Sequence, residues 1–215
     1  MKPAVIDPPE IWARLWSGFE GRIGWDIGAN CGQTVPIMLD NFEQVIAFEP
    51  AAECWPYLEQ FAGNFTFLPI GLSDRDDHID LLELPDKIDT GQLVTAGTCG
   101  MEWNPNRPDA SVRTVISRTA DSLISEAALQ APDFMKIDTE GHELRVLFGA
   151  RQTLAVHRPD LLIEFHSPEL HSSCEALLEQ YGYQCETIRH PHYRPGTPMW
   201  KQHGWLKAKQ MTSPA

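Results

Sequence analysis

The chain has 215 residues, of which 42% are hydrophobic and 22% are charged, and 17 Lys and Arg against 30 Asp and Glu give a formal net charge of −13. This composition predicts a single domain over residues 1–215 that is large enough to bury a core. The acid excess disfavours nucleic acid and membrane surfaces as partners, because both attract clustered Lys and Arg.

No apolar run approaches the roughly 18 to 20 residues of a membrane span, and the first residues lack the pattern of a secretory signal. The five cysteines are odd in number and scattered, which indicates neither a disulfide framework nor a structural zinc site. We therefore expect reduced thiols and a cytoplasmic location.

The N-terminal segment, residues 1–20, contains Trp12, Leu15, Trp16 and Phe19 at helical spacing. This periodicity predicts a helix whose apolar side packs on a sheet. Two alternatives stay open for the same side chains: a lid over a ligand, and a contact between two copies of the chain in a homo-oligomer.

Short apolar runs alternate with helical segments along most of the chain. The apolar runs predict buried parallel strands, which we place at residues 22–27, 44–48, 64–70, 134–137 and 160–165. The predicted helices are residues 33–41, 52–62, 121–131 with Asp121 as N-cap, 143–155 and 168–181. This alternation implies right-handed βαβ crossovers, and so an α/β fold with an open, doubly wound sheet.

Two segments depart from this alternation. Residues 85–110 are rich in Gly, Asn, Pro and Thr and too long for an ordinary connection, so they form either a mobile lid or a disordered stretch. Residues 183–188 and 204–209 predict two strands, joined by a late loop over residues 189–203, that pair antiparallel and close the sheet.

A glycine-rich loop, Asp26-Ile-Gly28-Ala-Asn30-Cys-Gly32-Gln-Thr34, lies where the first predicted strand turns into a helix. Glycines let the backbone approach a ligand, and the helix N-terminus offers N–H groups. Glu49 follows Gly28 by 21 residues and ends the second strand, where a carboxylate accepts hydrogen bonds from ribose hydroxyls. Together they indicate an adenosine-type ligand; the alternative is a tight turn without a ligand.

The spacing of this loop separates two cofactors. The dinucleotide pattern GxGxxG needs glycine at position 33, which is Gln33, whereas the D-x-G-x-G-x-G pattern of methyltransferases is met except at Asn30. Asn is a common substitute for Gly at positive φ. The loop therefore favours S-adenosylmethionine over a nicotinamide cofactor. An NAD(P)-dependent oxidoreductase on the same fold and a non-catalytic S-adenosylmethionine-binding module are the alternatives.

Six motifs occur in an order that resembles one family. They are WDIGANCGQT, AFEP, PIGLSD, TADSLI, MKIDTEGHELRVLFGA and RPDLLIEFH. Through them the chain resembles the FkbM-type family of S-adenosylmethionine-dependent methyltransferases over residues 22–166, most specifically in KIDTEGHE. The chain departs at Ala120, which is usually Leu, and shows no family pattern after Glu186. The resemblance implies the Rossmann-like class I methyltransferase fold, with a mostly parallel seven-stranded sheet and an antiparallel last strand. It also implies O-methylation of a hydroxyl, often on a sugar or another natural-product scaffold.

Positions in these motifs give the expected cofactor site. The glycine loop would hold the methionine half, Glu49 the ribose, and by family position the Ser73-Asp74 turn the adenine edge. The expected cofactor-binding residues are Asp26, Gly28, Asn30, Gly32, Gln33, Thr34, Glu49, Pro50, Ser73, Asp74 and Asp138.

Methyl transfer to oxygen needs alignment and removal of the hydroxyl proton. Lys136 and Asp138 share one face of the fourth strand, and Asp138 lies at the edge where ligands bind. Asp138 either orients the cofactor's ammonium group or acts as the base. Glu164 and His166 share a face at the end of the next strand, so His166 is the other candidate base. Lys136 either has a direct role or neutralises Asp138 or Glu164.

The remaining polar residues have weaker claims. His142 is a weaker candidate base, and Glu140 and Glu143 resemble first-turn helix acids, the preferred interpretation for Glu143. Asp138, Glu164, His166 and His142 also resemble a divalent-metal cluster, but no tight ligand spacing such as HExxH supports it, so we predict no metal ligands.

The charge is uneven along the chain, because residues 189–215 contain five basic residues and no acid. His190, His192, Tyr193 and Arg194 lie in the late loop of this tail, either solvated or gripping a polar substrate. An acidic or phosphorylated small acceptor with a hydroxyl group is therefore compatible with the sequence, although nucleic acid stays disfavoured.

Overall fold

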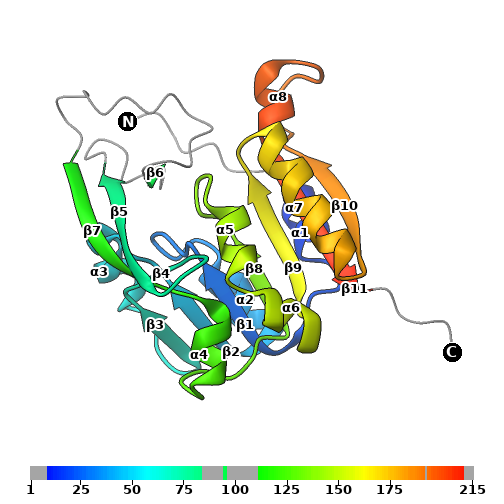
Figure 1. Cartoon of the computed structure of the whole chain (residues 1–215). Coiled ribbons are helices and arrows are strands. Elements are labelled where there is room, and N and C mark those ends of the chain that lie inside the picture. The colour runs from blue at the N-terminus through cyan, green and yellow to red at the C-terminus, as the bar shows by residue number, and fades with distance from the viewer. Residues whose placement is uncertain (1–8, 84–93, 96–110, 192, 211–215) are drawn as a thin grey trace, which may run out of the picture.

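The computed structural model describes residues 9–83, 94–95, 111–191 and 193–210 (Figure 1). Its helices are α1 (Pro9–Trp16), α2 (Val35–Asn41), the 3-10 turn η1 (Ala52–Cys54), α3 (Trp55–Leu58), α4 (Ala120–Ser125), α5 (Glu143–Phe148), α6 (Arg151–Val156), α7 (Pro168–Gln180) and α8 (Pro198–Gln202). Its strands are β1 (Gly21–Ile27), β2 (Phe42–Phe48), β3 (Phe65–Leu68), β4 (Gly71–Leu72), β5 (Asp77–Glu83), β6 (Val94–Thr95), β7 (Ser111–Arg118), β8 (Phe134–Ile137), β9 (Asp160–Phe165), β10 (Tyr183–Arg189) and β11 (Gly204–Gln210).

The main sheet has seven strands in the order β10-β11-β9-β8-β1-β2-β3. The pairs β1–β2, β2–β3, β1–β8 and β8–β9 are parallel, whereas β11 runs antiparallel to both β9 and β10. The predicted mostly parallel sheet with an antiparallel last strand is confirmed. Because β1 pairs with β2 on one side and β8 on the other, the switch point where open α/β sheets bind ligands lies at the end of β1.

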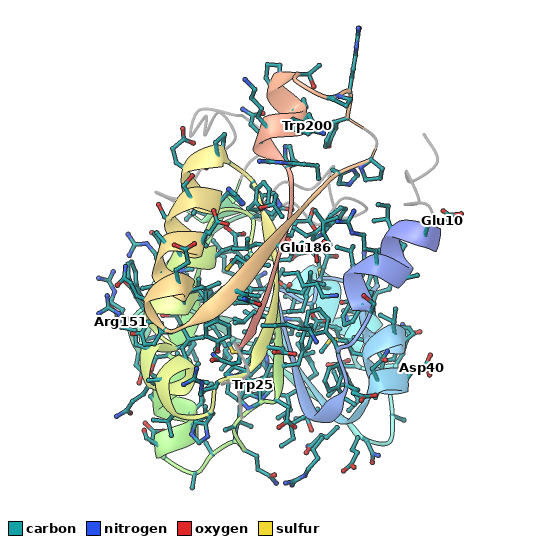
Figure 2. The ribbon with its side chains drawn as sticks, turned by 90° about the vertical axis from the view of Figure 1, so that its right-hand side faces the viewer. Glu10, Trp25, Asp40, Arg151, Glu186 and Trp200 are labelled. Carbon is teal, nitrogen blue, oxygen red and sulfur yellow. The ribbon has the colours of Figure 1, made fainter. Side chains whose placement is uncertain are left out.

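Helices cover both faces of this sheet, as the doubly wound prediction requires. In Figure 2, Trp25 of β1 lies between Arg151 of α6 on one side and Asp40 of α2 on the other. The larger core lies on the side of α4 to α7, and a second core lies under α1 and α2. Within the described residues, no helix combines the length and the apolar character that a membrane span needs.

The N-terminal helix packs on the sheet as predicted. Leu15, Trp16 and Phe19 are buried in the second core, where the ring centroids of Trp16 and Phe19 lie 5.6 and 4.5 Å from that of Phe134 in β8. Burial of aromatic side chains of this size stabilises a domain by a few kcal/mol each. Phe134 is the first residue of β8, so this contact holds the end of α1 and the residues after it on one face of the sheet.

A second sheet, in the order β4-β7-β5-β6, was not predicted. Strand β5 pairs antiparallel with β7, and Figure 1 shows both to one side of the main sheet. Val112 and Ile116 of β7 are exposed, so the strand lacks the buried apolar run by which the other strands are recognised. Of the predicted lid over residues 85–110, only Val94–Thr95 lies within the described residues.

Several helical segments differ from the prediction. The helix predicted over 121–131 is α4, which ends at Ser125. The helix predicted over 143–155 is broken into α5 and α6 at Gly149, where a Cβ atom would lie 1.9 Å from the carbonyl oxygen of Ser73. The segment 52–62 contains only η1 and α3. The late loop over 189–203 contains an unpredicted helix, α8, which Thr197 caps by accepting a hydrogen bond from the N–H of Trp200.

The N-cap prediction at Asp121 is wrong. Thr119 caps α4 by accepting a hydrogen bond from the N–H of Ser122. Asp121 lies in the first turn, and its carboxylate accepts hydrogen bonds from the backbone N–H groups of Gln152 and Thr153, each at 2.8 Å. Asp121 therefore binds the N-terminus of α6, a tertiary contact that local sequence does not reveal.

Candidate active site

A cavity of about 350 Å³ lies at the carboxyl ends of the central strands, between the glycine loop, α1 and β11. This volume is typical of small-ligand sites. Eight of the predicted site residues line it: Gly28, Asn30, Gln33, Thr34, Glu49, Pro50, Lys136 and Asp138. Asp26, Gly32, Ser73, Asp74 and His166 do not line it.

The glycine loop is held from beneath by a buried ion pair. The Nζ atom of Lys136 lies 3.1 Å from Oδ1 of Asp26 and donates a hydrogen bond of 2.7 Å to the carbonyl oxygen of Gly28. The hydroxyl of Thr34 donates to Oδ2 of Asp26 at 2.6 Å. Burial alone would lower the pKa of Lys136, but the charges of Asp26 and Asp138 outweigh it and raise that pKa. Asp26 therefore shapes the loop instead of lining the cavity.

Lys136 neutralises two carboxylates inside the sheet. Its second acidic neighbour is Asp138, whose Oδ2 lies 3.6 Å from Nζ. The sequence suggested Asp138 or Glu164 as the partner of Lys136. In the structure Lys136 forms ion pairs with Asp138 and also with Asp26. Lys136 also lines the cavity, so the same side chain neutralises carboxylates and lies at the site.

The backbone of the loop requires left-handed conformations. Gly28 has φ of +76°, and a Cβ atom there would lie 1.9 Å from the carbonyl oxygen of Asp138, so this position excludes any other residue. Asn30 has φ of +50°, which agrees with its interpretation as a glycine substitute. Its side-chain Oδ1 accepts a hydrogen bond of 2.6 Å from the N–H of Cys31.

Glu49 lines the cavity directly after β2. Its two carboxylate oxygens accept hydrogen bonds from the N–H groups of Asn30 at 2.8 Å and Ala51 at 2.9 Å. Burial raises the pKa of Glu49 to about 7, against the opposing effect of these two N–H groups. Each oxygen keeps a lone pair for a further donor such as a ribose hydroxyl.

The Ser73-Asp74 turn packs against α5 and does not line the cavity. Ser73 is buried, and its hydroxyl lies 2.8 Å from Nε2 of His142, while Asp74 binds Arg145 at 3.1 Å. Burial lowers the pKa of His142 to about 4, so its imidazole is neutral. The preceding strand β4, Gly71–Leu72, lines the cavity in place of the turn.

His166 is held by a buried carboxylate that the sequence analysis took for an ordinary helix acid. Its Nδ1 lies 3.2 Å from Oε1 of Glu143, which also accepts hydrogen bonds from the N–H groups of Thr139 at 3.1 Å and Gly141 at 2.9 Å. Burial would raise the pKa of Glu143, but these hydrogen bonds lower it. Glu143 lies in the first turn of α5, as expected, but its side chain is fully buried and also holds His166, which the interpretation as a first-turn acid did not include.

Glu140 is a site residue that the sequence analysis undervalued. It lies before α5, has φ of +53°, and lines the cavity with Oε2 3.5 Å from Nε2 of His166. Oδ1 of Asp138 lies 3.7 Å from the same nitrogen. Burial, opposed by the charge of His166, raises the pKa of Glu140 to about 8. The ends of β8 and β9 therefore bring together two carboxylates and an imidazole.

The far end of the cavity is aromatic. Trp12, Trp16, Glu164 and Trp205 line it, and the indole Nε1 of Trp205 donates to Oε2 of Glu164 at 3.0 Å. Burial, together with the neighbouring charge of Asp138, raises the pKa of Glu164 to about 7. The ring of His190 in the late loop stacks on Trp205, with centroids 4.8 Å apart. His192 lies outside the described residues.

The basic residues of the tail are used to hold the fold. Lys207 donates a hydrogen bond of 2.6 Å to the carbonyl oxygen of Ser17, and Lys209 binds Asp160 at 3.2 Å. Arg189 packs over the rings of Phe165 and Trp200. Within the described residues, no basic residue of the tail lines the cavity. Of the two alternatives for the tail, a grip on an acidic acceptor therefore gains no support from these residues.

Comparison with known proteins agrees with this architecture. The chain is 27% identical over 140 residues to the hexuronic acid methyltransferase AglP of Haloferax volcanii, an alignment that covers 63% of this chain and 52% of the relative. The chain thus spans about half the length of that curated relative.

Two solved structures share the fold. The FkbM methyltransferase of Methylobacillus flagellatus superposes with a TM-score of 0.54 at 22% identity, covering 87% of this chain and 43% of that one. A protein of Streptococcus mutans, determined in complex with SAH, superposes with a TM-score of 0.53 at 10% identity and covers 96% of this chain and 99% of that one. The profile of the FkbM methyltransferase domain matches residues 26–185, which is more than half of the chain. The chain therefore belongs to the FkbM methyltransferase family.

Proposed function

We propose that the protein transfers the methyl group of S-adenosylmethionine to a hydroxyl group of a small, sugar-like molecule. The observation that carries this proposal is the single cavity that joins the Glu49 carboxylate, at the end of β2, to Asp138, at the end of β8. A cofactor with its ribose at Glu49 and its sulfonium directed toward Asp138 would span these two points.

The residues present fit such a cofactor. Glu49 offers two oxygens to ribose hydroxyls, and the glycine loop lines the cavity with Gly28 and Asn30 between Glu49 and Asp138. The apolar side chains of Leu72, Ile79 and Leu81 line the side of β4 and β5, where an adenine ring would be enclosed. The SAH complex of the S. mutans protein with the same fold supports this cofactor.

The bound cofactor supplies an electrophilic methyl group on sulfur. The enzyme's task is to align the acceptor oxygen with that methyl group and to remove the hydroxyl proton as the carbon–oxygen bond forms and the carbon–sulfur bond breaks. We assign Asp138 and His166 to this point. Glu143 holds the His166 ring, and Lys136 holds Asp138, so both side chains are fixed before a substrate binds.

The acceptor would occupy the end of the cavity lined by Trp12, Trp16 and Trp205. Flat aromatic faces offer apolar surface to the C–H groups of a sugar ring, and Glu164 offers an acceptor to its hydroxyl groups. The relative from H. volcanii acts on a hexuronic acid, which supports a sugar-type acceptor for this chain.

Cofactor binding is the first test. Isothermal titration calorimetry should give micromolar affinity for S-adenosylhomocysteine and no heat with NADH. Glu49→Gln should weaken the affinity about tenfold or more, because a charge-assisted acceptor is lost. Glu43→Gln, at the exposed start of the same strand, is the matched control and should leave it unchanged.

Product formation is the second test. Incubation with S-adenosylmethionine and a panel of hydroxylated sugars and uronic acids should give a product heavier by one methylene, with the methyl carbon on oxygen by NMR. No heat with either sulfur ligand would overturn the proposal. Cofactor binding without any product, unchanged by His166→Ala, would indicate a non-catalytic module.

A further inference from the structure

We infer that Asp138, Glu140 and His166 form a binding site for one divalent cation of the first transition row. One oxygen of each carboxylate and one imidazole nitrogen lie within 4.8 Å of one another. Two carboxylates and one imidazole are a ligand set that suits Mn²⁺ or a similar ion.

The distances fit a single ion between the three side chains. Nε2 of His166 lies 3.5 Å from Oε2 of Glu140 and 3.7 Å from Oδ1 of Asp138. Ligands bound at about 2.1 Å stand roughly 3 to 3.5 Å apart when adjacent and about 4.2 Å apart when opposite. Small side-chain rotations would therefore bring all three atoms to bonding distance of one centre.

The imidazole of His166 provides the second, independent observation. Its side chain is only 9% exposed, and among the described residues no hydrogen bond is formed by Nε2. Oε1 of Glu143 lies 3.2 Å from Nδ1, so Nε2 is the ring nitrogen that faces the two carboxylates, and it would lose its proton when it binds a cation. A carboxylate that fixes the far nitrogen of a metal-binding histidine is a recurrent arrangement.

The charges of the residues that line the cavity also favour a bound cation. Asp138, Glu140 and Glu164 line it, whereas the lining lysine, Lys136, is shared between Asp26 and Asp138. A cation at the cluster would offset this acid excess. It would differ from the metal cluster considered from the sequence, since Glu140 replaces Glu164 and His142, and His142 lies against Ser73.

The role of the cation rests on the proposed function. Three protein ligands leave coordination positions open toward the cavity, where the acceptor oxygen would bind. Coordination lowers the pKa of a bound hydroxyl. Because Nε2 of His166 is then a ligand, the proton would pass to Glu164, which lines the same cavity.

The test uses Mn²⁺ and the full chain without cofactor or acceptor. Electron paramagnetic resonance of free Mn²⁺ should show one ion bound per chain, and the electron spin echo of the bound ion should carry the modulation of a coordinated imidazole nitrogen. The echo modulation is measured on the wild-type chain, so it tests the site even if a substitution disturbs folding. Glu140→Gln should weaken Mn²⁺ binding at least tenfold, whereas Asp40→Asn, an exposed carboxylate on α2, should not.

The outcomes separate this inference from the proposed function. Absence of Mn²⁺ binding, equal binding by wild type and Glu140→Gln, or bound Mn²⁺ without nitrogen modulation would overturn the metal site. Binding of S-adenosylhomocysteine in EDTA is measured on the same preparation. If S-adenosylhomocysteine binds and Mn²⁺ does not, the metal site is wrong and the proposed function stands. If Mn²⁺ binds and S-adenosylhomocysteine does not, the metal site stands and the proposed function is wrong.

Discussion

The Nζ atom of Lys136 lies 2.7 Å from the carbonyl oxygen of Gly28, a residue 108 positions earlier in the chain. This hydrogen bond joins the fourth parallel strand to the glycine loop, and the ion pair with Asp26 lies beside it. The cofactor loop is therefore positioned by a buried charge from the neighbouring strand as well as by its own glycines.

Removal of this charge should destabilise the fold. Lys136→Met leaves Asp26 buried without its cation, and a broken buried pair costs about 3 to 5 kcal/mol. Urea unfolding followed by circular dichroism measures the loss. In the double variant Asp26→Asn/Lys136→Met, much of the stability should return, because no unpaired charge remains.

The matched control is Lys201→Met, an exposed lysine on α8, which should change the free energy of unfolding by less than about 0.5 kcal/mol. If the losses of Asp26→Asn and Lys136→Met simply add in the double variant, the two side chains are not energetically coupled and the ion pair does not hold the loop.

Glu49 should make cofactor binding depend on pH. Its pKa of about 7 in the free protein is raised by burial. Ribose hydroxyls donate to the ionised carboxylate, so binding lowers this pKa and releases a proton. Affinity for S-adenosylhomocysteine should therefore rise with pH through about 7 and be about tenfold weaker at pH 6 than above pH 8. Calorimetry in buffers of different ionisation enthalpy measures the released proton.

Glu49→Gln provides the control, since an amide does not titrate. Its weaker affinity should stay constant over the same pH range. A wild-type affinity that is flat between pH 6 and 8, or a variant that keeps the full pH dependence, would assign the titration to another group.

Local signals in the sequence were sufficient for the central sheet. The runs ending at Ile27, Phe48, Ile137 and Phe165 are mostly apolar, because both faces of these strands are buried. The residue that follows each run is a predicted site residue, namely Gly28, Glu49, Asp138 and His166. The second sheet gave no such signal. Its strand β7 alternates exposed apolar with buried polar residues, such as Val112 and Ser117, since only one face packs on the protein.

The candidate site shows a similar division. Glu49 and Asp138 follow apolar strands, so their place at the sheet edge could be derived from position alone. The role of Glu143 could not, because it depends on a turn with two left-handed residues, Glu140 and Gly141, that folds the N–H groups and His166 onto one carboxylate oxygen. Such a convergence is a tertiary property that neither periodicity nor spacing encodes.

Gly149, which lies between α5 and α6, should be required for the close packing of this segment against the Ser73 turn. A Cβ atom there would lie 1.9 Å from the carbonyl oxygen of Ser73, which is backbone and cannot move aside. Gly149→Ala should lower the free energy of unfolding by more than about 2 kcal/mol. At Gly71, the nearest atom to an added Cβ is the Ile79 side chain at 3.5 Å. Gly71→Ala should therefore cost less than about 1 kcal/mol; equal losses in urea unfolding would contradict the role of Gly149.

Trp12 should separate acceptor binding from cofactor binding. It lines the cavity and packs against the apolar cluster that contains Trp205, so we expect it to contact the acceptor and not the cofactor. Trp12→Ala should raise the KM for the acceptor found in the sugar panel about tenfold, because an aromatic contact of about 1.4 kcal/mol is lost. The Kd of S-adenosylhomocysteine should change less than about twofold. Trp200→Ala, on α8 and not in the cavity lining, is the matched control and should leave both constants unchanged. If Trp12→Ala instead weakens S-adenosylhomocysteine as much as it raises the KM, the α1 end of the cavity holds the cofactor and the assignment of the two ends must be exchanged.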